Sequence, residues 1–492
     1  MHHSLSRVAT TIVVGLLVVA CASAASSAPI TTALPNSSPP ASGSTSPRPT
    51  DLFPSLSPPV PAALPVRGSA YGLGVLMAPG PDGGVYISVP GPDGSVLALL
   101  DRDGIPRAGW PITVPGSVSC GQPVSVEDGS VRIVCTLDNP QGNMFGPIGA
   151  FAFDSTGSSH AGWPVDLAAH GLVTVRAVGD GLIAHAWTIS GDVILEGQPA
   201  GDSWIMTADP DATVRNGARA PYGMGCCGPD EWALGPDGVA YGVVHHGAAT
   251  LARTTSELTA VGPDGVPAGF PIAIEGIASR PAFDAAGRIH VTVGLPIEPP
   301  ARTLVFDPDG RAVVGRSGEL DITATSDWRG AGNVFPAAPL VGADGTTFII
   351  ETLAGTSVIG LGPSGQVMPG WPYRSDVGLE DTGFCGPHDT GCGQYRATPT
   401  IGPGNVLYLL HAAASPSAGG SIVAIGPDGR VRPGWPVELR QPGAEFWSVT
   451  VGSDGTAYVL AIEPESGDTY SAGILAIAPD GTVLSTTTIV DP

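Results

Sequence analysis

The chain has 492 residues, a formal net charge of −23 and a sequence pI near 4.5. Such an acidic surface argues against nucleic acid or an anionic membrane surface as a partner. Glycine (70 residues) and proline (51 residues) are abundant. Because most glycines recur at regular intervals beside β-rich runs, they predict turns between strands and not low-complexity disorder.

The first 21 residues are predicted to be an export signal. Arg7 precedes an apolar run from Val8 to Ala20, which is too short for a stable membrane span. The run ends in Val18-Val19-Ala20-Cys21, which resembles the bacterial lipobox. That resemblance implies that Cys21 becomes the lipid-bearing first residue of the mature protein. The alternative is ordinary cleavage after Ala24, which would release a secreted protein without an anchor.

Residues 22–66 are predicted to be a disordered tether. They contain 11 Pro and 14 Ser or Thr, almost no charge and no apolar periodicity. Such a segment cannot bury enough surface to offset its ordering entropy. We therefore expect one folded domain, residues 67–492, held clear of a membrane by the tether.

Two families of glycine turns divide the folded domain into repeats. One family is Gly83, Gly129, Gly181, Gly238, Gly287, Gly345, Gly404 and Gly455; the other is Gly104, Gly157, Gly265, Gly310, Gly365, Gly429 and Gly481, with Asp211-Ala212 in the missing place. The distance from Gly104 to Gly481 divides into seven steps of about 54 residues each, so eight units are predicted.

Each unit is predicted to contain four strands, A to D, with one glycine turn between A and B and the other between C and D. A Gly-Trp-Pro motif follows the second turn at Trp110, Trp163, Trp371 and Trp435, and Phe270 replaces Trp in a fifth unit. Because Pro cannot donate to a central ladder, strand D should be an edge strand. Its aromatic side chain should cover the neighbouring unit, and the third, fifth and eighth units, which lack it, must pack differently.

Eight such units predict an all-β fold, an eight-bladed β-propeller of four-stranded antiparallel blades, in which radial closure buries both faces of each blade. A seven-bladed ring is the alternative, with the degenerate third unit left out. The paired turns and Gly-Trp-Pro edges over residues 70–490 resemble the PQQ-binding-like β-propeller repeat family. Lipobox, tether and blades together resemble the propeller lipoproteins of outer-membrane assembly. That resemblance implies a scaffold or protein-recognition role.

Besides Cys21, six cysteines remain, and an even number in an exported protein suggests disulfides. Cys120 and Cys135 flank a turn as facing positions of a hairpin would. Cys385 and Cys392 are expected to pinch one loop. The adjacent pair Cys226-Cys227 forms either a vicinal disulfide or two free thiols.

Strand direction places both glycine turns on one side of the domain and the B–C and D–A connections on the other. The second side holds most of the irregular sequence, and variable loops on a rigid scaffold commonly carry function. Aromatic, Arg and acidic side chains there are our candidates for contact with a ligand or partner: Tyr222, Glu231, Trp232, Asp327, Trp328, Arg329, His388, Asp389, Tyr395 and Arg396.

No catalytic or metal-binding motif is found among those searched: no HExxH helix, no GxSxG elbow and no phosphate-binding loop. We therefore predict no catalytic residue, metal or cofactor. An enzymatic alternative comes from resemblance. In quinoprotein dehydrogenases PQQ lies between a Trp and a ring of adjacent cysteines beside a calcium ion, which would match Cys226-Cys227 with Trp232 or Trp328. A lyase-like propeller is a further alternative.

The sequence thus predicts an exported binding or scaffold protein, lipid-anchored at the cell membrane and facing the periplasm or the exterior. Its partner would be an envelope or extracellular protein or a small solute. We expect a monomer that touches the membrane only through its anchor.

Overall fold

In the computed structural model the chain is almost entirely β-structure. The structure describes residues 75–91, 93–126, 129–138, 148–166, 174–178, 181–187, 203–208, 214–215, 219–220, 232–246, 255–262, 265–294, 302–313, 318–319, 338–351, 356–377, 379, 399–411, 420–439, 445–464 and 470–490. All of them belong to one structural unit, residues 51–492. None of the described helices is long and apolar enough to span a membrane.

The described strands form eight antiparallel sheets. The first sheet contains β1 (Leu76–Pro79), β2 (Val85–Val89), β3 (Val96–Leu100) and β4 (Ile112–Thr113), with the short 3-10 helix η1 (Pro81–Gly83) after β1. The second contains β5 (Ser117–Cys120), β6 (Val124–Ser125), β7 (Val131–Leu137), β8 (Ile148–Phe153) and β9 (Val165–Asp166). The third contains β10 (Thr174–Val178), β11 (Gly181–Trp187), β12 (Ser203–Ala208), β13 (Val214–Arg215) and β14 (Arg219–Ala220).

The next three sheets follow in chain order. The fourth contains β15 (Trp232–Leu234), β16 (Ala240–His246), β17 (Thr255–Val261) and β18 (Ile272–Glu275). The fifth contains β19 (Ile277–Ala278), β20 (Ala282–Phe283), β21 (Ile289–Gly294), β22 (Arg302–Phe306) and β23 (Gly318–Glu319). The sixth contains β24 (Leu340–Val341), β25 (Thr347–Glu351), β26 (Thr356–Leu361) and β27 (Tyr373–Ser375).

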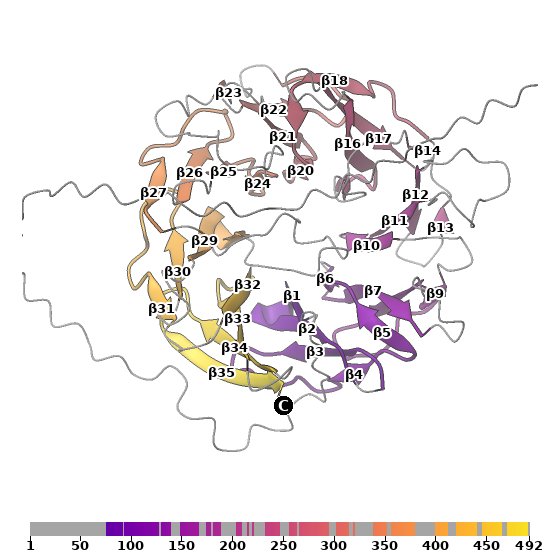
Figure 1. Ribbon diagram of the computed structural model, residues 1–492, viewed down its shortest axis with the longest axis vertical. Helices are drawn as coiled ribbons and strands as arrows, with labels where there is room; N and C mark the ends of the chain where they lie inside the picture. Colours follow the sequence, from indigo (N-terminus) through magenta and orange to yellow (C-terminus); the bar gives the residue numbers. More distant parts are fainter. Residues whose placement is uncertain are drawn as a thin grey trace, which may run out of the picture. The chain divides into compact units, whose positions relative to one another are not determined.

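The last two sheets complete the series. The seventh contains β28 (Thr400–Gly402), the 3-10 helix η5 (Pro403–Asn405), β29 (Val406–His411), β30 (Gly420–Ile425) and β31 (Val437–Leu439). The eighth contains β32 (Glu445–Val451), β33 (Ala457–Pro464), β34 (Tyr470–Ile477) and β35 (Val483–Val490). Figure 1 shows the sheets following one another around a ring, with β1, β10, β24 and β32 toward the middle and β4, β13, β27 and β35 toward the rim. This is the architecture of a β-propeller.

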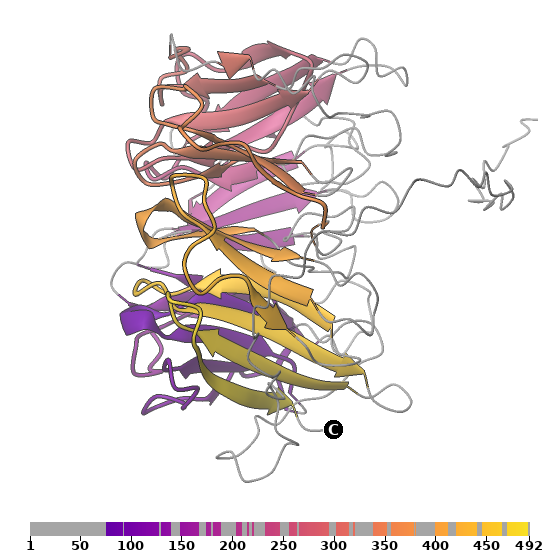
Figure 2. The same ribbon diagram turned by 90° about the vertical axis from the view of Figure 1, so that its left-hand side faces the viewer.

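The glycine turns have the predicted conformation. Gly104 (φ +78°), Gly429 (φ +73°) and Gly455 (φ +87°) lie in the left-handed region, which only glycine adopts readily. An Asp side chain in each of these turns accepts backbone N–H groups of the turn. For example, one carboxylate oxygen of Asp101 accepts the backbone N–H groups of Asp103 and Ile105, each at 2.9 Å. Figure 2 shows the described short turns, with η1 among them, projecting to one side of the ring.

Each Gly-Trp-Pro motif joins its own sheet to the next one. The indole N–H of Trp110 donates to Ser155 O at 3.0 Å, that of Trp371 to Pro427 O at 3.0 Å, and that of Trp435 to Pro479 O at 3.1 Å. The acceptor always lies in the C–D turn of the following sheet. The prediction that the aromatic side chain of the motif covers the neighbouring unit is therefore confirmed for these three motifs.

The motif itself lies before strand D and not within it. β31 begins at Val437, after Trp435-Pro436, and β4 begins at Ile112, after Trp110-Pro111. Strand D is the edge strand as predicted. The physical reason for the later start is that proline has no N–H for the ladder, so pairing begins only beyond it.

The core lies between consecutive sheets. A Tyr near the start of strand B packs against the aromatic of the same sheet: Tyr86 on Trp110 with ring centroids 5.5 Å apart, and Tyr408 on Trp435 at 5.6 Å. The same Tyr then reaches forward, because Tyr86 Oη donates to Gly129 O at 2.8 Å and Tyr408 Oη to Gly455 O at 3.2 Å. Both contacts point from one sheet to the next.

The ring closes without strand exchange. All strands of the first and eighth sheets come from their own chain segments. Tyr458 Oη donates to Gly83 O, Ser485 Oγ to Arg102 O at 3.2 Å, and Thr487 Oγ1 to Gly104 O at 3.4 Å. A shared apolar cluster, which includes Ile87 and Leu460, fills the space between the two sheets. Although the eighth sheet lacks the Gly-Trp-Pro motif, it thus makes equivalent forward contacts with other side chains.

Candidate functional site

The side of the ring opposite the glycine turns is where the sequence places the candidate contacts. Trp232 is the first residue of β15, with its backbone opposite Gly242 of β16. The other predicted contact residues lie outside the described residues: Tyr222, Glu231, Asp327, Trp328, Arg329, His388, Asp389, Tyr395 and Arg396. Cys21, Cys226, Cys227, Cys385 and Cys392 also lie outside them.

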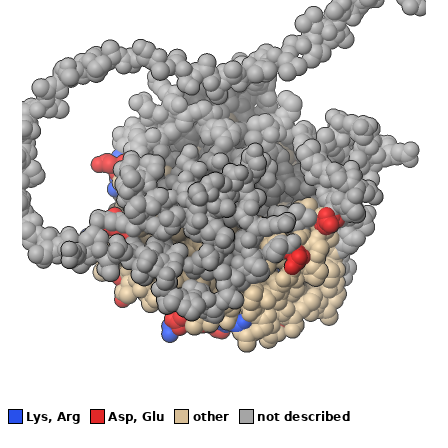
Figure 3. Space-filling view, turned by 60° about the horizontal axis from the view of Figure 1, so that its bottom comes forward, with Lys and Arg blue, Asp and Glu red and all other residues tan. Residues whose placement is uncertain are grey.

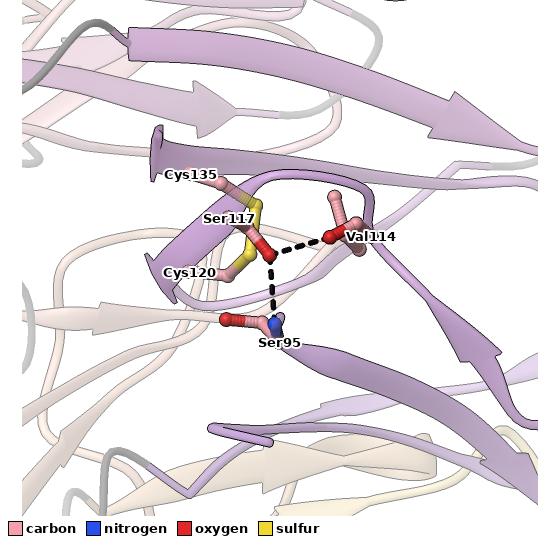
Figure 4. Close-up of a disulfide and its surroundings, with 5 residues drawn as sticks. All are labelled: Ser95, Val114, Ser117, Cys120 and Cys135. Carbon is pink, nitrogen blue, oxygen red and sulfur yellow. Dashed lines mark hydrogen bonds between the residues drawn. A yellow bond between two sulfur atoms is a disulfide. The ribbon is translucent and has the colours of Figure 1, made fainter. Parts of the chain in front are cut away.

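The predicted bridge between Cys120 and Cys135 is confirmed. The two residues face each other in the register of β5 and β7 and are joined by a disulfide. Beside it, Figure 4 shows the Ser117 hydroxyl, which accepts the Ser95 N–H at 2.7 Å and donates to Val114 O at 2.7 Å. The disulfide fixes β5 to β7 within the second sheet, and the hydroxyl fixes β5 to the end of the first sheet.

The links that lead from one sheet to the next on this side are held by buried hydroxyls. Ser256 Oγ donates to Gly276 O at 2.8 Å and accepts the Ala278 N–H at 2.9 Å. Thr356 Oγ1 donates to Val377 O at 2.8 Å. These bonds make the described base of this side rigid, which is what a recognition surface on loops requires.

Two segments of the chain, at Leu379 and at Thr400, pair with β29, the second strand of the seventh sheet. Leu379 pairs with His411 of β29, and Thr400 pairs with Tyr408 of the same strand. The segment between Leu379 and Thr400 includes the candidates His388, Asp389, Tyr395 and Arg396. It therefore begins and returns beside β29.

His411 is an unexpected polar residue at this point. Its side chain is 5% exposed, and Nε2 has no hydrogen-bond partner. Its ring stacks on that of Tyr373, with centroids 6.5 Å apart and planes 14° from parallel. Burial lowers the pKa of His411, so the ring is neutral at pH 7, and burial raises the pKa of Tyr373. The sequence does not mark His411 as a candidate site residue, because the strand that contains it resembles every other strand B.

A second polar centre lies between the fifth and sixth sheets. The fully buried carboxylate of Asp284 accepts from Arg288 Nε at 2.5 Å and lies 3.4 Å from His290 Nε2. His290 Nδ1 is 3.1 Å from Thr347 Oγ1. Burial alone would raise the pKa of Asp284, but the hydrogen bonds and charge of Arg288, together with the bond to His290, hold that pKa below its ordinary value.

This chain of carboxylate, imidazole and hydroxyl has the order of a hydrolase triad, but its burial excludes that use. Asp284, His290 and Thr347 are each 3% exposed or less, so no substrate reaches the hydroxyl. Among the described residues no group of three or more His, Cys, Asp or Glu side chains is arranged to hold a metal ion. Of the residues that resemblance assigns to PQQ, Cys226, Cys227 and Trp328 lie outside the described part, and Trp232 begins β15.

The described surface has no large patch of one charge in the view of Figure 3, where acidic and basic side chains are scattered. Two of the arginines pair with nearby carboxylates: Arg107 with Asp82 at 3.2 Å and Arg311 with Asp309 at 3.0 Å. These are exposed pairs of small energetic weight.

Comparison with solved structures supports the fold. The chain is similar to dipeptidyl peptidase 4 of Porphyromonas gingivalis (TM-score 0.50, 10% identity, 85% of this chain and 60% of that one). The chain thus spans less than two thirds of the peptidase.

Two further structures match less closely. One is the β-propeller domain of the Trilobed protease from Pyrococcus furiosus (TM-score 0.41, 10% identity, 85% of this chain and 98% of that one). The other is a quinonprotein alcohol dehydrogenase-like protein from Bacteroides thetaiotaomicron (TM-score 0.36, 12% identity, 89% and 94%). No protein-family model matches the sequence, and a search of curated proteins finds no match. At these identities the similarity concerns the fold alone.

Proposed function

We propose that this chain is an exported, lipid-anchored, eight-bladed β-propeller that acts as a binding or scaffold protein at the cell envelope. In this proposal Cys21 carries the lipid, residues 22–66 form the tether, and the propeller faces the periplasm or the exterior as a monomer. Its partner is an envelope or extracellular protein or a small solute.

The binding role is supported by a difference between the two sides of the ring. On the turn side, the turns accept the forward bonds of Trp110, Trp371 and Trp435 from the preceding sheets. Those backbone groups are therefore occupied in holding the ring together. Recognition is left to the opposite side, whose described base is fixed by the hydroxyls of Ser256 and Thr356 and by the Cys120–Cys135 disulfide.

Site-specific photocrosslinking tests the binding side. A photoreactive residue replaces Trp328 or Tyr395 in the full chain, expressed in its native envelope. The matched controls carry it at Thr156 or Asp428, exposed residues of the glycine turns. We expect one defined crosslinked species from the first pair and none from the controls. Equal crosslinking from both sides would contradict the proposal.

Thermal unfolding with PQQ and Ca²⁺ tests the enzyme alternative. A ligand at about a hundred times its dissociation constant stabilises the native state by about 2.7 kcal/mol. No shift of the transition is expected from the binding protein. A clear shift that disappears when Cys226 and Cys227 are changed to Ser would establish a quinoprotein-like site instead.

The lipid anchor has its own test. Mass spectrometry of the mature N-terminus should find a lipid-modified Cys21, and Cys21→Ser should release the protein from membranes. An unmodified N-terminus after Ala24 would show secretion without an anchor.

A further inference from the structure

The contact between the fifth sheet (β19–β23) and the sixth (β24–β27), called here the polar seam, differs from the other described contacts. Ile289, Val291 and Val293 of β21 pack backward into the apolar cluster shared with the fourth sheet. Because side chains alternate along a strand, His290 and Thr292 point forward to the sixth sheet. The sequence already predicts different packing here, because the fifth unit lacks the Gly-Trp-Pro aromatic.

The described residues of the polar seam bury little apolar surface. The described cluster on the sixth sheet that faces it has Ile349 and Leu361 as buried members, with Ile359 partly buried beside them. The contact between the seventh and eighth sheets, by contrast, buries Trp435, Phe446 and many aliphatic side chains. Because apolar burial is the main stabilising contribution, the polar seam gains less from packing.

His290 lies near the start of the strand after the first turn, as Tyr86, Tyr408 and Tyr458 do in other sheets. Those tyrosines donate directly to the turn glycine carbonyl of the next sheet. His290 instead meets Thr347 Oγ1, which is 3.3 Å from Gly345 O. The direct forward bond is therefore replaced by a relay through a second side chain.

Two buried hydroxyls in the polar seam have no partner. Thr292 and Thr303 face each other directly in the pairing of β21 and β22. They are 2% and 1% exposed, and neither Oγ1 makes a hydrogen bond. An unpaired buried hydroxyl loses its hydration without compensation, so both destabilise the closed seam.

We propose that the ring opens at the polar seam before it opens at its closure between the eighth and first sheets. The closure joins the two ends of the sequence, yet it has a large apolar cluster and three forward bonds, from Tyr458, Ser485 and Thr487. Among the described residues, the polar seam has neither a large apolar cluster nor an indole bond. This inference does not depend on the proposed binding role.

Hydrogen exchange of the full chain, followed by mass spectrometry, tests the order of opening. Peptides from β21, β22, β25 and β26 should exchange faster than peptides from β2, β3, β33 and β34. We expect protection lower by about tenfold, which corresponds to about 1.4 kcal/mol of opening free energy. Faster or equal exchange at the closure would overturn the proposal.

A double variant, Thr292→Val with Thr303→Val, tests the cause. It keeps the shape of both side chains and removes the unpaired hydroxyls, so exchange in β21, β22, β25 and β26 should slow while β2 and β33 are unchanged. Thr356→Val, which removes an equally buried hydroxyl that does have a partner, should speed exchange near β26 and β27. If the double variant exchanged faster, the hydroxyls would hold the seam closed, and the proposal would fail.

Discussion

The close approach of Gly434 to the next sheet yields a sharp prediction. Gly434 has φ +85°, and a Cβ placed there would overlap the carbonyl oxygen of Asp480. The variant Gly434→Ala must therefore push the eighth sheet away. That movement removes the Trp435 bond to Pro479 O (3.1 Å), a neutral hydrogen bond with a net contribution of about 1 kcal/mol. It also weakens the bond from Tyr408 Oη to Gly455 O of the eighth sheet (3.2 Å), a further contribution of about 1 kcal/mol.

Gly404 provides the matched control. It has a similar left-handed conformation, φ +67°, but no atom lies within 4 Å of its added Cβ. Gly404→Ala therefore suffers only the left-handed penalty of about 1–2 kcal/mol, which Gly434→Ala shares. In urea denaturation followed by circular dichroism, we expect Gly434→Ala to be the less stable variant by about 2 kcal/mol. Equal losses would refute the view that contact between sheets requires glycine at 434.

Three further predictions concern other contacts. Replacing Cys120 and Cys135 with Ser removes a cross-link between residues 15 apart, and urea denaturation should show a free energy of unfolding lower by about 3 kcal/mol. An unchanged urea midpoint would mean that the disulfide does not stabilise the fold. Because the pKa of Asp284 is lowered in the folded state, its carboxylate stabilises the fold fully above its unfolded pKa of about 3.9, and this stability is lost as pH falls through the folded pKa. In Asp284→Asn, the free energy of unfolding should therefore change less with pH in the acid range. An unchanged dependence on pH would contradict this. Tyr458→Phe removes one hydrogen bond between the eighth and first sheets and should lower the free energy of unfolding by about 1 kcal/mol in the same denaturation assay. Tyr408→Phe, which removes the equivalent bond between the seventh and eighth sheets, should lower it by the same amount. A much larger loss from Tyr458→Phe would indicate that closure is the weak point of the ring.

The repeat made most of the fold predictable. Left-handed glycines, the forward position of Trp110 and Trp435, and the Cys120–Cys135 pairing all follow from local spacing, and all are confirmed. The sequence associates Trp-Pro with strand D, whereas the pairing of that strand begins just after the proline, because a motif shows where pairing is impossible and not where it resumes.

The polar features were harder to predict. Aligning the units would have placed His290 in line with Tyr86, Tyr408 and Tyr458, so a signal for the polar seam existed in the sequence. No such signal marks His411, whose character depends on the pairing of Leu379. That pairing joins positions that are far apart in the sequence. The predicted contacts His388 and Tyr395 lie outside the described residues and remain predictions.

The forward contacts have a consequence for assembly. The first, sixth and seventh sheets each offer an indole donor near the outer edge, and the sheet that follows offers an acceptor at its turn. This is a head-to-tail contact of the kind that makes either rings or endless filaments between separate subunits. Here the repeats are fused in one chain, and the acceptor turn of the first sheet already receives Ser485 and Thr487 of the last. The donors of β35 are therefore already bonded to the turn of the first sheet. Another molecule could bind to that turn only by displacing β35.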